Sequence, residues 1–204
     1  MTRPDRAARR GAGGGSQIDA AREYALRLLE RPRTEYQVRM ALARRGFDGA
    51  VQDEVVGRLR GLGLLDDVAY ARAYIEETLV RRPMGRRALA VALARRGVSR
   101  EHVRLALAQV EESMRMDVGA DAGPAGREGE PDAGAAGPEG EPGDLEEVAA
   151  RRAGQAWLRR NRHRPDACRL QGYLMRRGFG RELAVRTVRE LLGEESDDAF
   201  PGGG

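Results

Sequence analysis

Apolar side chains recur along the chain at intervals that are typical of amphipathic helices. Val38 and Leu42 are four residues apart, so both lie on one face of a helix. After an intervening glycine, Val56 and Leu59 form a second such face with a spacing of three. The two pairs return twice further along the chain, as Leu89/Leu93 with Leu107/Val110 and as Leu170/Leu174 with Val188/Leu191. The pattern predicts a pair of amphipathic helices that occurs three times.

A short sequence motif contains the second residue of the first apolar pair each time the pattern occurs. The stretch ALARRG stands at 41–46 and again at 92–97, and the related YLMRRG stands at 173–178. The interval between the second and third occurrences is longer because it contains the segment 117–143, which is rich in Gly, Pro and acids. Without that segment the chain shows one period of about 50 residues, used three times.

Each period has room for a third helix before the pair. We predict these first helices at roughly 19–30, 67–81 and 144–160. The predicted fold is therefore all-α, with three tandem three-helix repeats that resemble helix-turn-helix units. A repeat of this size is marginal for independent folding, so repeats 1 and 2 should pack together. Repeat 3 is expected to move separately.

Residues suited to helix ends support this division. Thr34 to Gln37 fits a capping box at the start of a middle helix, and Ser99 can cap the last helix of repeat 2. Asp66 and Asp67 can cap that repeat's first helix. Pro83 and Pro165 stand near helix starts, where proline is tolerated.

The remaining segments lack apolar periodicity. We predict a disordered basic arm, a flexible acidic linker rich in Gly and Pro, and a disordered acidic tail, because such sequences bury too little apolar surface to offset chain ordering. The predicted divisions are the arm (1–17), repeat 1 (18–63), repeat 2 (64–116), the linker (117–143), repeat 3 (144–193) and the tail (194–204).

Composition and charge narrow the class of protein. Aromatic residues make up only 4%, so a core must be built from Leu, Val and Ala, which suits helices. The net charge is +4, but the linker and the tail are acidic, so the repeats are strongly basic. Every basic residue is arginine, which reflects either a GC-rich genome or a use for guanidinium groups. A basic body attracts nucleic acid or acidic protein surfaces.

The sequence shows little sign of catalysis. His102 and His163 fall at different places in the repeat, and neither has metal-ligand spacing to Cys168. We interpret His102 as partly buried and Cys168 as a packing residue, since no base stands at a readable spacing. The glycines at 11–15 lack the ending of a phosphate loop. No catalytic residue, metal site or cofactor is predicted.

The aromatic residues allow two readings. Tyr24, Tyr36, Tyr70 and Tyr74 occur among arginines and could stack on bases, but interhelical packing is the simpler interpretation. Trp157 is interpreted as a core anchor.

The arginine pairs before each glycine also allow two readings. Cations in the last turn of a helix are favoured by its dipole, by about 0.3–1 kcal/mol, and the glycine can end the helix. Other arginine pairs do not precede a glycine, which favours an anionic partner. The candidate contacts are Arg44, Arg45, Arg81, Arg82, Arg86, Arg87, Arg95, Arg96, Arg159, Arg160, Arg176 and Arg177.

Over about 20–112 and 145–192 the chain resembles the RecX family, regulators of the bacterial recombinase RecA. The most specific stretch is GLGLLDDVAYARAYIEETL at 61–79, similar to the family's Leu-Asp-Asp-x-x-Tyr/Phe-Ala signature. RPRTEYQVRMALARRGF and MGRRALAVALARRGV are similar to the segments around it, and YLMRRGF to the last repeat. The acidic insert and the N-terminal arm depart from compact members. The signature is carried by Leu65, Asp66, Asp67, Tyr70 and Ala71.

The resemblance implies an elongated, curved arrangement of repeats that binds the RecA filament on single-stranded DNA. It also implies inhibition of the ATPase, strand-exchange and co-protease activities of RecA in DNA repair and the SOS response, without catalytic residues or cofactors. We expect a cytoplasmic monomer with no membrane partner and no small-molecule substrate, because no signal peptide or membrane span is apparent. A helix-turn-helix-like DNA-binding regulator is the main alternative. A structural adaptor is a third reading, and an enzyme is the most distant.

Overall fold

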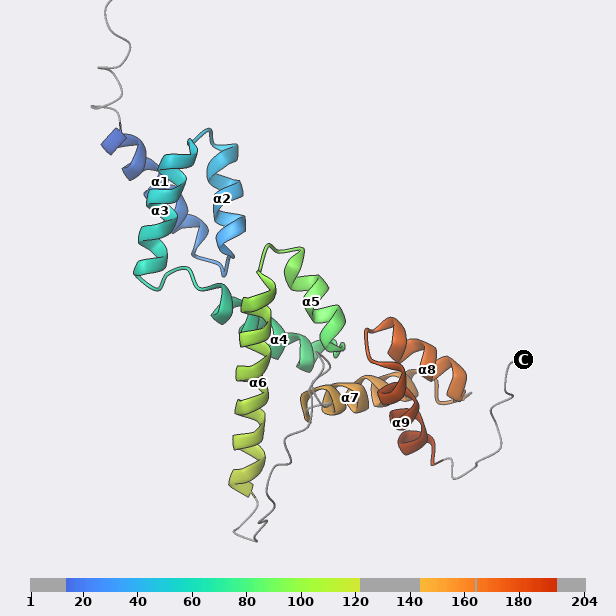
Figure 1. The fold of residues 1–204 in the computed structure, drawn as a ribbon. Helices are drawn as coiled ribbons and strands as arrows, with labels where there is room; N and C mark the ends of the chain where they lie inside the picture. Colours follow the sequence, from blue (N-terminus) through green and yellow to red (C-terminus); the bar gives the residue numbers. More distant parts are fainter. Residues whose placement is uncertain (1–13, 122–143, 164, 194–204) are drawn as a thin grey trace, which may run out of the picture. The chain divides into compact units, whose positions relative to one another are not determined.

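The computed structural model describes residues 14–121, 144–163 and 165–193, and these residues form nine α-helices with no strand (Figure 1). Repeat 1 consists of α1 (Gly14–Leu28), α2 (Glu35–Arg44) and α3 (Gly49–Gly61). Repeat 2 consists of α4 (Asp67–Arg81), α5 (Arg86–Ala94) and α6 (Arg100–Asp121). Repeat 3 consists of α7 (Asp144–Arg160), α8 (Ala167–Arg176) and α9 (Arg181–Leu192). The all-α fold predicted from the apolar spacing is confirmed.

The helices group into two compact units. Unit 1 spans residues 1–73 and 92–106, and unit 2 spans 74–91 and 107–204. All three helices of repeat 2 therefore contribute one end to each unit. This division follows contacts rather than the sequence period, and the domain bounds predicted from the period stay a prediction.

The predicted apolar faces form the cores. Val38, Leu42, Val56 and Leu59 are nearly completely buried in repeat 1, together with Ala21 and Ala25 of α1. In repeat 3, α7, α8 and α9 pack against one another around Leu170, Leu174 and Val188 (Figure 1). Small alanines on the first helix of each repeat let the other two helices approach closely.

The same turn ends the middle helix of every repeat. Gly46, Gly97 and Gly178 all have φ near +85°, a left-handed conformation that glycine adopts without steric cost. In each turn, the N–H of the apolar residue after glycine donates to the carbonyl of a fully buried leucine at 3.2–3.3 Å, from Phe47 to Leu42, Val98 to Leu93 and Phe179 to Leu174. This is the Schellman arrangement, and it explains why the sequence repeats Leu-x-Arg-Arg-Gly-apolar.

Two helices extend into segments that were predicted to be disordered or flexible. α1 begins at Gly14, so the last four residues of the predicted basic arm are helical. α6 continues through Asp121, so the first five residues of the predicted linker are helical too. Extending an existing helix requires no new nucleus, which allows α6 to run into a sequence of weak periodicity. The other residues of the arm and the linker, and the tail, lie outside the described residues.

The predicted helix ends mostly agree with the structure. Thr34 and Gln37 form the complete capping box, and the Ser99 hydroxyl accepts a hydrogen bond from the His102 N–H at 3.1 Å. The Asp66 carboxylate caps α4 by accepting from the N–H groups of Val68 and Ala69. Asp67 was predicted to share that role, but its carboxylate binds the backbone of α2 instead.

Candidate functional site

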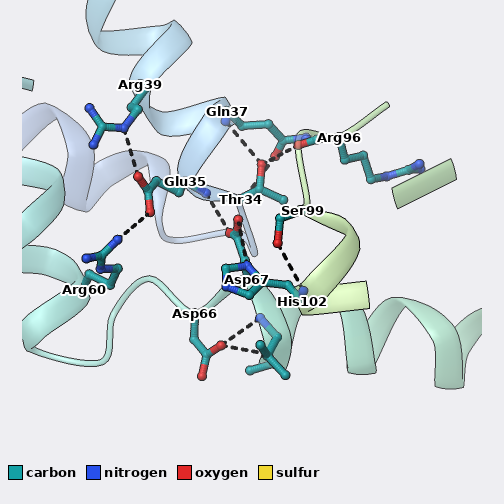
Figure 2. A network of polar contacts seen from close by, with 12 residues as sticks. Thr34, Glu35, Gln37, Arg39, Arg60, Asp66, Asp67, Arg96, Ser99 and His102 are labelled. Atoms are coloured by element: carbon teal, nitrogen blue, oxygen red, sulfur yellow. Dashed lines mark hydrogen bonds and ion pairs between the residues drawn. The ribbon is translucent and has the colours of Figure 1, made fainter. Parts of the chain in front are cut away.

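The start of α2 in repeat 1 meets the end of α5 in repeat 2, and both segments belong to unit 1 (Figure 2). The Thr34 hydroxyl donates to the carbonyl of Arg96 at 2.7 Å and accepts from the N–H of Gln37 at 3.2 Å. Thr34 is completely buried. We call this contact junction 1. The hydroxyl thus gives a partner both to the carbonyl of Arg96 and to an N–H of the first turn of α2, which has no acceptor within its own helix.

A carboxylate from the first helix of repeat 2 completes junction 1. The Glu35 N–H donates to Asp67 Oδ1 at 2.8 Å, so a residue of α4 supplies the negative group that the start of α2 favours (Figure 2). The Glu35 side chain points the other way and pairs with Arg39 at 3.0 Å and with Arg60 at 3.4 Å. Two helices of repeat 1 and one helix of repeat 2 therefore meet in a single polar network.

A related arrangement recurs within unit 2, where repeat 2 meets repeat 3 through a backbone N–H in place of the hydroxyl, and we call it junction 2. The Gly85 N–H donates to the carbonyl of Arg177 at 3.0 Å, and the Arg86 N–H donates to Glu146 Oε1 at 3.2 Å. Gly85 and Arg177 occupy the repeat positions of Thr34 and Arg96. Repeat 3 was expected to move separately, but these two hydrogen bonds connect it to repeat 2.

The acidic residues of the two junctions hold equivalent positions in the first helices of repeats 2 and 3. Asp67 stands four residues before the buried Ala71, and Glu146 stands four residues before the buried Ala150. One turn of helix thus separates the residue that packs inside its own repeat from the residue that binds the previous repeat.

Glycine permits both junctions sterically. A Cβ on Gly97 would lie 2.2 Å from the Cβ of Tyr36, and a Cβ on Gly178 would lie 2.6 Å from the Cβ of Ala88. Gly85 is equally constrained, since its Cβ would meet the carbonyl oxygen of Gly178 at 2.3 Å. These glycines therefore serve the contact between repeats as well as the turn.

The predicted family signature has structural roles, and one of its residues, Asp67, takes part in junction 1. Leu65 is buried in the core of repeat 1, and Ala71 is completely buried. Asp66 caps α4, Asp67 caps α2, and Tyr70 is half-buried. The sequence located the signature, but its role depends on a contact between segments more than 30 residues apart.

Burial sets the electrostatics of the two junction acids. Burial raises the pKa of Asp67 above its ordinary value of 3.8, and the hydrogen bond from the Glu35 N–H and the charge of His102 oppose the shift. His102 is partly buried, as predicted, with Nδ1 3.9 Å from Asp67 Oδ2. Burial likewise raises the pKa of Glu146, against the N–H and the charge of Arg86.

Five of the twelve candidate arginines contact other groups of the chain, and four of them, Arg86, Arg177, Arg45 and Arg96, lie at a junction or in a turn. Arg86 lies between Glu111 and Glu146 at junction 2, with Nε 3.8 Å from the Glu146 carboxylate. Arg177 donates to the carbonyl of Pro83 at 3.1 Å and lies over the ring of Tyr173. Arg45 covers the ring of Tyr24 at 4.4 Å, and Arg96 donates to the carbonyl of Ala92 at 2.7 Å.

Arg45 is exposed despite its contact, and so are the other eight candidates: Arg44, Arg81, Arg82, Arg87, Arg95, Arg159, Arg160 and Arg176. Arg44, Arg95 and Arg176 hold the same position in successive repeats, at the first arginine of each pair. Among the residues that the structure describes, none of these three has an ion pair, whereas Arg81 pairs with Glu77 at 3.0 Å. The pairs thus divide into an outer arginine that faces solvent and an inner arginine that contacts its own chain.

The cysteine and the aromatic residues agree only in part with their interpretation from the sequence. Cys168 is exposed near the start of α8, so its interpretation as a packing residue was wrong. Trp157 is only half-buried, with its ring centre 6.4 Å from that of Tyr173. Tyr24, Tyr70 and Tyr74 are half-buried, while Tyr36 is 50% exposed beside Gly97. The described side chains contain no group of acids, His and Cys arranged to hold a metal ion.

Comparisons with known proteins point to one family. Residues 21–59 match the family model described as RecX, first three-helix domain, and residues 66–107 match RecX, second three-helix domain. A protein named Regulatory protein RecX from Thermobifida fusca is 34% identical over 210 aligned positions, which cover 97% of each chain. A protein of the same name from Streptomyces coelicolor is 29% identical over 182 positions, covering 89% of this chain and 82% of its own.

Solved structures show the same fold. The crystal structure of RecX from Lactobacillus salivarius superposes with a TM-score of 0.65 at 16% identity, over 88% of this chain and 99% of the other. A second crystal structure, of regulatory protein RecX, gives a TM-score of 0.62 at 20% identity, over 95% of this chain and 80% of the other. None of the described helices is long and apolar enough to cross a membrane.

The role of Gly97 in junction 1 can be separated from its role in the turn. Gly46→Ala and Gly97→Ala both place a side chain at φ near +85°, but only the second also meets Tyr36. We expect Gly97→Ala to lower the free energy of unfolding by about 1–3 kcal/mol more than Gly46→Ala, because overpacking adds to the backbone cost. Urea denaturation measures both variants, and equal losses would contradict the packing argument.

The raised pKa of Asp67 predicts a pH-dependent contribution to stability. Since the folded state holds this proton more tightly than the unfolded state, ionisation of Asp67 lowers stability as pH rises from 3.8 through the raised pKa. Asp67→Asn keeps an oxygen acceptor for the Glu35 N–H but does not titrate. The free energy of unfolding of the variant should therefore rise relative to the natural protein across this range. Urea denaturation from about pH 3.5 to about pH 6 tests this, and parallel curves would refute it.

Proposed function

Because the chain belongs to the RecX family, we propose that it is a non-enzymatic modulator, mainly an inhibitor, of the recombinase RecA. In this proposal it binds the RecA filament on single-stranded DNA in the bacterial cytoplasm. Binding reduces the ATPase, strand-exchange and co-protease activities of the filament, and so limits DNA repair by recombination and the SOS response. The relatives carry the name of regulatory proteins, which supports the class of function.

The observation that carries the proposal is the exposure of Arg44, Arg95 and Arg176 at equivalent repeat positions. A guanidinium group donates two parallel hydrogen bonds to a phosphate or a carboxylate, so it suits either the DNA or the protein of a filament. Each of these arginines also lies near a helix C-terminus, where a cation is favoured before any partner arrives. A repeated cation is suited to a partner that is itself repetitive.

The inner arginines support this proposal indirectly. Arg45 and Arg177 lie over tyrosine rings of their own repeats, and their contacts hold the turns that carry the outer arginines. A turn fixed by a buried leucine and a left-handed glycine loses little entropy when its exposed arginine binds. The outer arginine is thus presented on a rigid support.

Inhibition can be measured directly. The full chain, added well below the molar amount of RecA on single-stranded DNA with ATP, should reduce ATP hydrolysis and shorten filaments seen by electron microscopy. Binding to duplex DNA of varied sequence is measured in parallel. Undiminished ATPase and filament length at every ratio, together with sequence-selective duplex binding, would favour a DNA-binding regulator instead.

The outer arginines can be tested with a matched control. Replacing Arg44, Arg95 and Arg176 by Glu should weaken filament binding, because each loses a charge-assisted contact worth about 1.5–3 kcal/mol. The slope of binding against salt should fall by about 0.7 for each arginine that contacts a single-strand phosphate. Fluorescence anisotropy of labelled filaments at several salt concentrations measures both effects.

The control replaces Arg58, Arg104 and Arg189 by Glu, one exposed arginine on the third helix of each repeat. This control changes the net charge by the same amount but at positions away from the glycine turns of the middle helices. If both triple variants bind equally weakly, the effect comes from net charge alone and the three equivalent arginines are not the site. Circular dichroism verifies that both variants keep their helical content.

A further inference from the structure

Each repeat has a middle-helix start and a glycine turn, and the two junctions use only two of the three starts and two of the three turns. Junction 1 joins the start of α2 to the turn of repeat 2, and junction 2 joins the start of α5 to the turn of repeat 3. Among the residues that the structure describes, the turn of repeat 1 and the start of α8 in repeat 3 have no such contact. Within the described part of the chain, repeat 1 therefore offers a carbonyl acceptor and repeat 3 an N–H donor that neither junction uses.

The unused turn of repeat 1 is open where its counterparts are covered. A Cβ on Gly46 would meet no atom within 4 Å, whereas one on Gly97 or Gly178 would meet the previous repeat at 2.2 or 2.6 Å. Phe47 is half-buried, while Val98 and Phe179 at the same position are each 4% exposed. The turn has the backbone of a junction and lacks only its partner.

The capping position of this open turn is also present. Gln17 stands four residues before the buried Ala21 of α1, in the register that Asp67 and Glu146 hold in the first helices of repeats 2 and 3. Gln17 is exposed. Its side-chain oxygen can accept a hydrogen bond from a helix N-terminus as the two carboxylates do.

The start of α8 is the matching half. Asp166 occupies the repeat position of Thr34 and Gly85, and it caps α8 by accepting from the Arg169 N–H at 2.8 Å. Thr34 and Gly85 are buried by their junctions, but Pro165, Asp166 and Cys168 are exposed. The first N–H groups of any helix have no partner within it, so this end resembles the starts of α2 and α5 before docking.

We propose that the start of α8 in one copy of this chain docks on the Arg45–Gly46 turn of a second copy, head to tail. The Asp166 N–H donates to the carbonyl of Arg45, as Gly85 does to Arg177 at junction 2. The Ala167 N–H donates to the side chain of Gln17, and Cys168 packs over Gly46 as Tyr36 packs over Gly97. The proposal rests on the internal repetition and does not depend on the function proposed above.

The two junctions within the chain indicate that the partner of the Arg45–Gly46 turn is a second copy of this chain. Both junctions seat the start of a middle helix on an Arg–Gly turn, and the exposed middle-helix start of repeat 3 belongs to this chain itself. The carboxylate of Asp166 complements the charges of Arg44 and Arg45, which adds an attraction that weakens with salt. Such a contact is heterologous, so it adds copies in a row. A single junction without a covalent chain binds weakly, in keeping with a monomer at low concentration.

The contact can be captured between two full-length chains that each carry one thiol. One chain carries Arg44→Cys with Cys168→Ser, and the other keeps only the native Cys168. They are mixed at high concentration with a short bismaleimide, and the product that joins positions 44 and 168 is identified by peptide mass spectrometry. The reference chain carries Arg58→Cys with Cys168→Ser, which places the thiol on an exposed position of α3.

We expect the 44–168 product to exceed the 58–168 product and to fall about tenfold when Gly46→Asn is added to the first chain. Asparagine tolerates the left-handed conformation, so this variant fills the docking surface while keeping the turn. Gly63→Asn, at φ +68° with open space around it, is the folding control and should leave the yield unchanged. Equal yields at 44 and 58, or a 44–168 yield unaffected by Gly46→Asn, would overturn the proposal.

Discussion

The structure depends on the pairing of two helix ends that leave opposite backbone groups unsatisfied. A middle helix ends with carbonyls that have no donor, and the next middle helix in space begins with N–H groups that have no acceptor. At both junctions the start of one middle helix donates to a carbonyl at the end of another, through the Thr34 hydroxyl to Arg96 and through the Gly85 N–H to Arg177. A left-handed glycine makes this possible, because it turns the chain and leaves room for the neighbouring backbone. Polar backbone groups, as well as apolar side chains, thus hold successive repeats together.

Much of this fold was predictable from the sequence because its determinants are local. The helices, the capping box at Thr34 and the turn at Gly46 each depend on residues a few positions apart, and all of them agree with the structure. The ends of α1 and α6 were predicted less well, since helix extension into Gly-containing segments depends on weak local preferences. The partner of Asp67 was not predictable, because Glu35 is brought beside it only by the packing of the repeats.

The candidate arginines likewise were predictable only as far as their surroundings depend on nearby residues. The sequence identified twelve arginines but could not separate those facing solvent from those bound within the chain. Arg86 and Arg87 are adjacent in sequence, yet Arg86 lies between two carboxylates and Arg87 is exposed. The sequence did contain one overlooked signal. The polar residue four positions before a buried alanine recurs in all three first helices, and in repeats 2 and 3 it marks the cap given to the preceding repeat.

The locality of each junction has a consequence for how such a chain can change length during evolution. Every junction uses one helix start, one turn and one polar cap, and it requires nothing from the remaining repeats. An in-frame duplication of a whole repeat would carry both halves of a junction with it, so the added copy would find a complete contact on each side. Selection could therefore vary the number of repeats without rebuilding a common core. The two terminal repeats would still be the ones whose outward surfaces must adapt to water or to a partner.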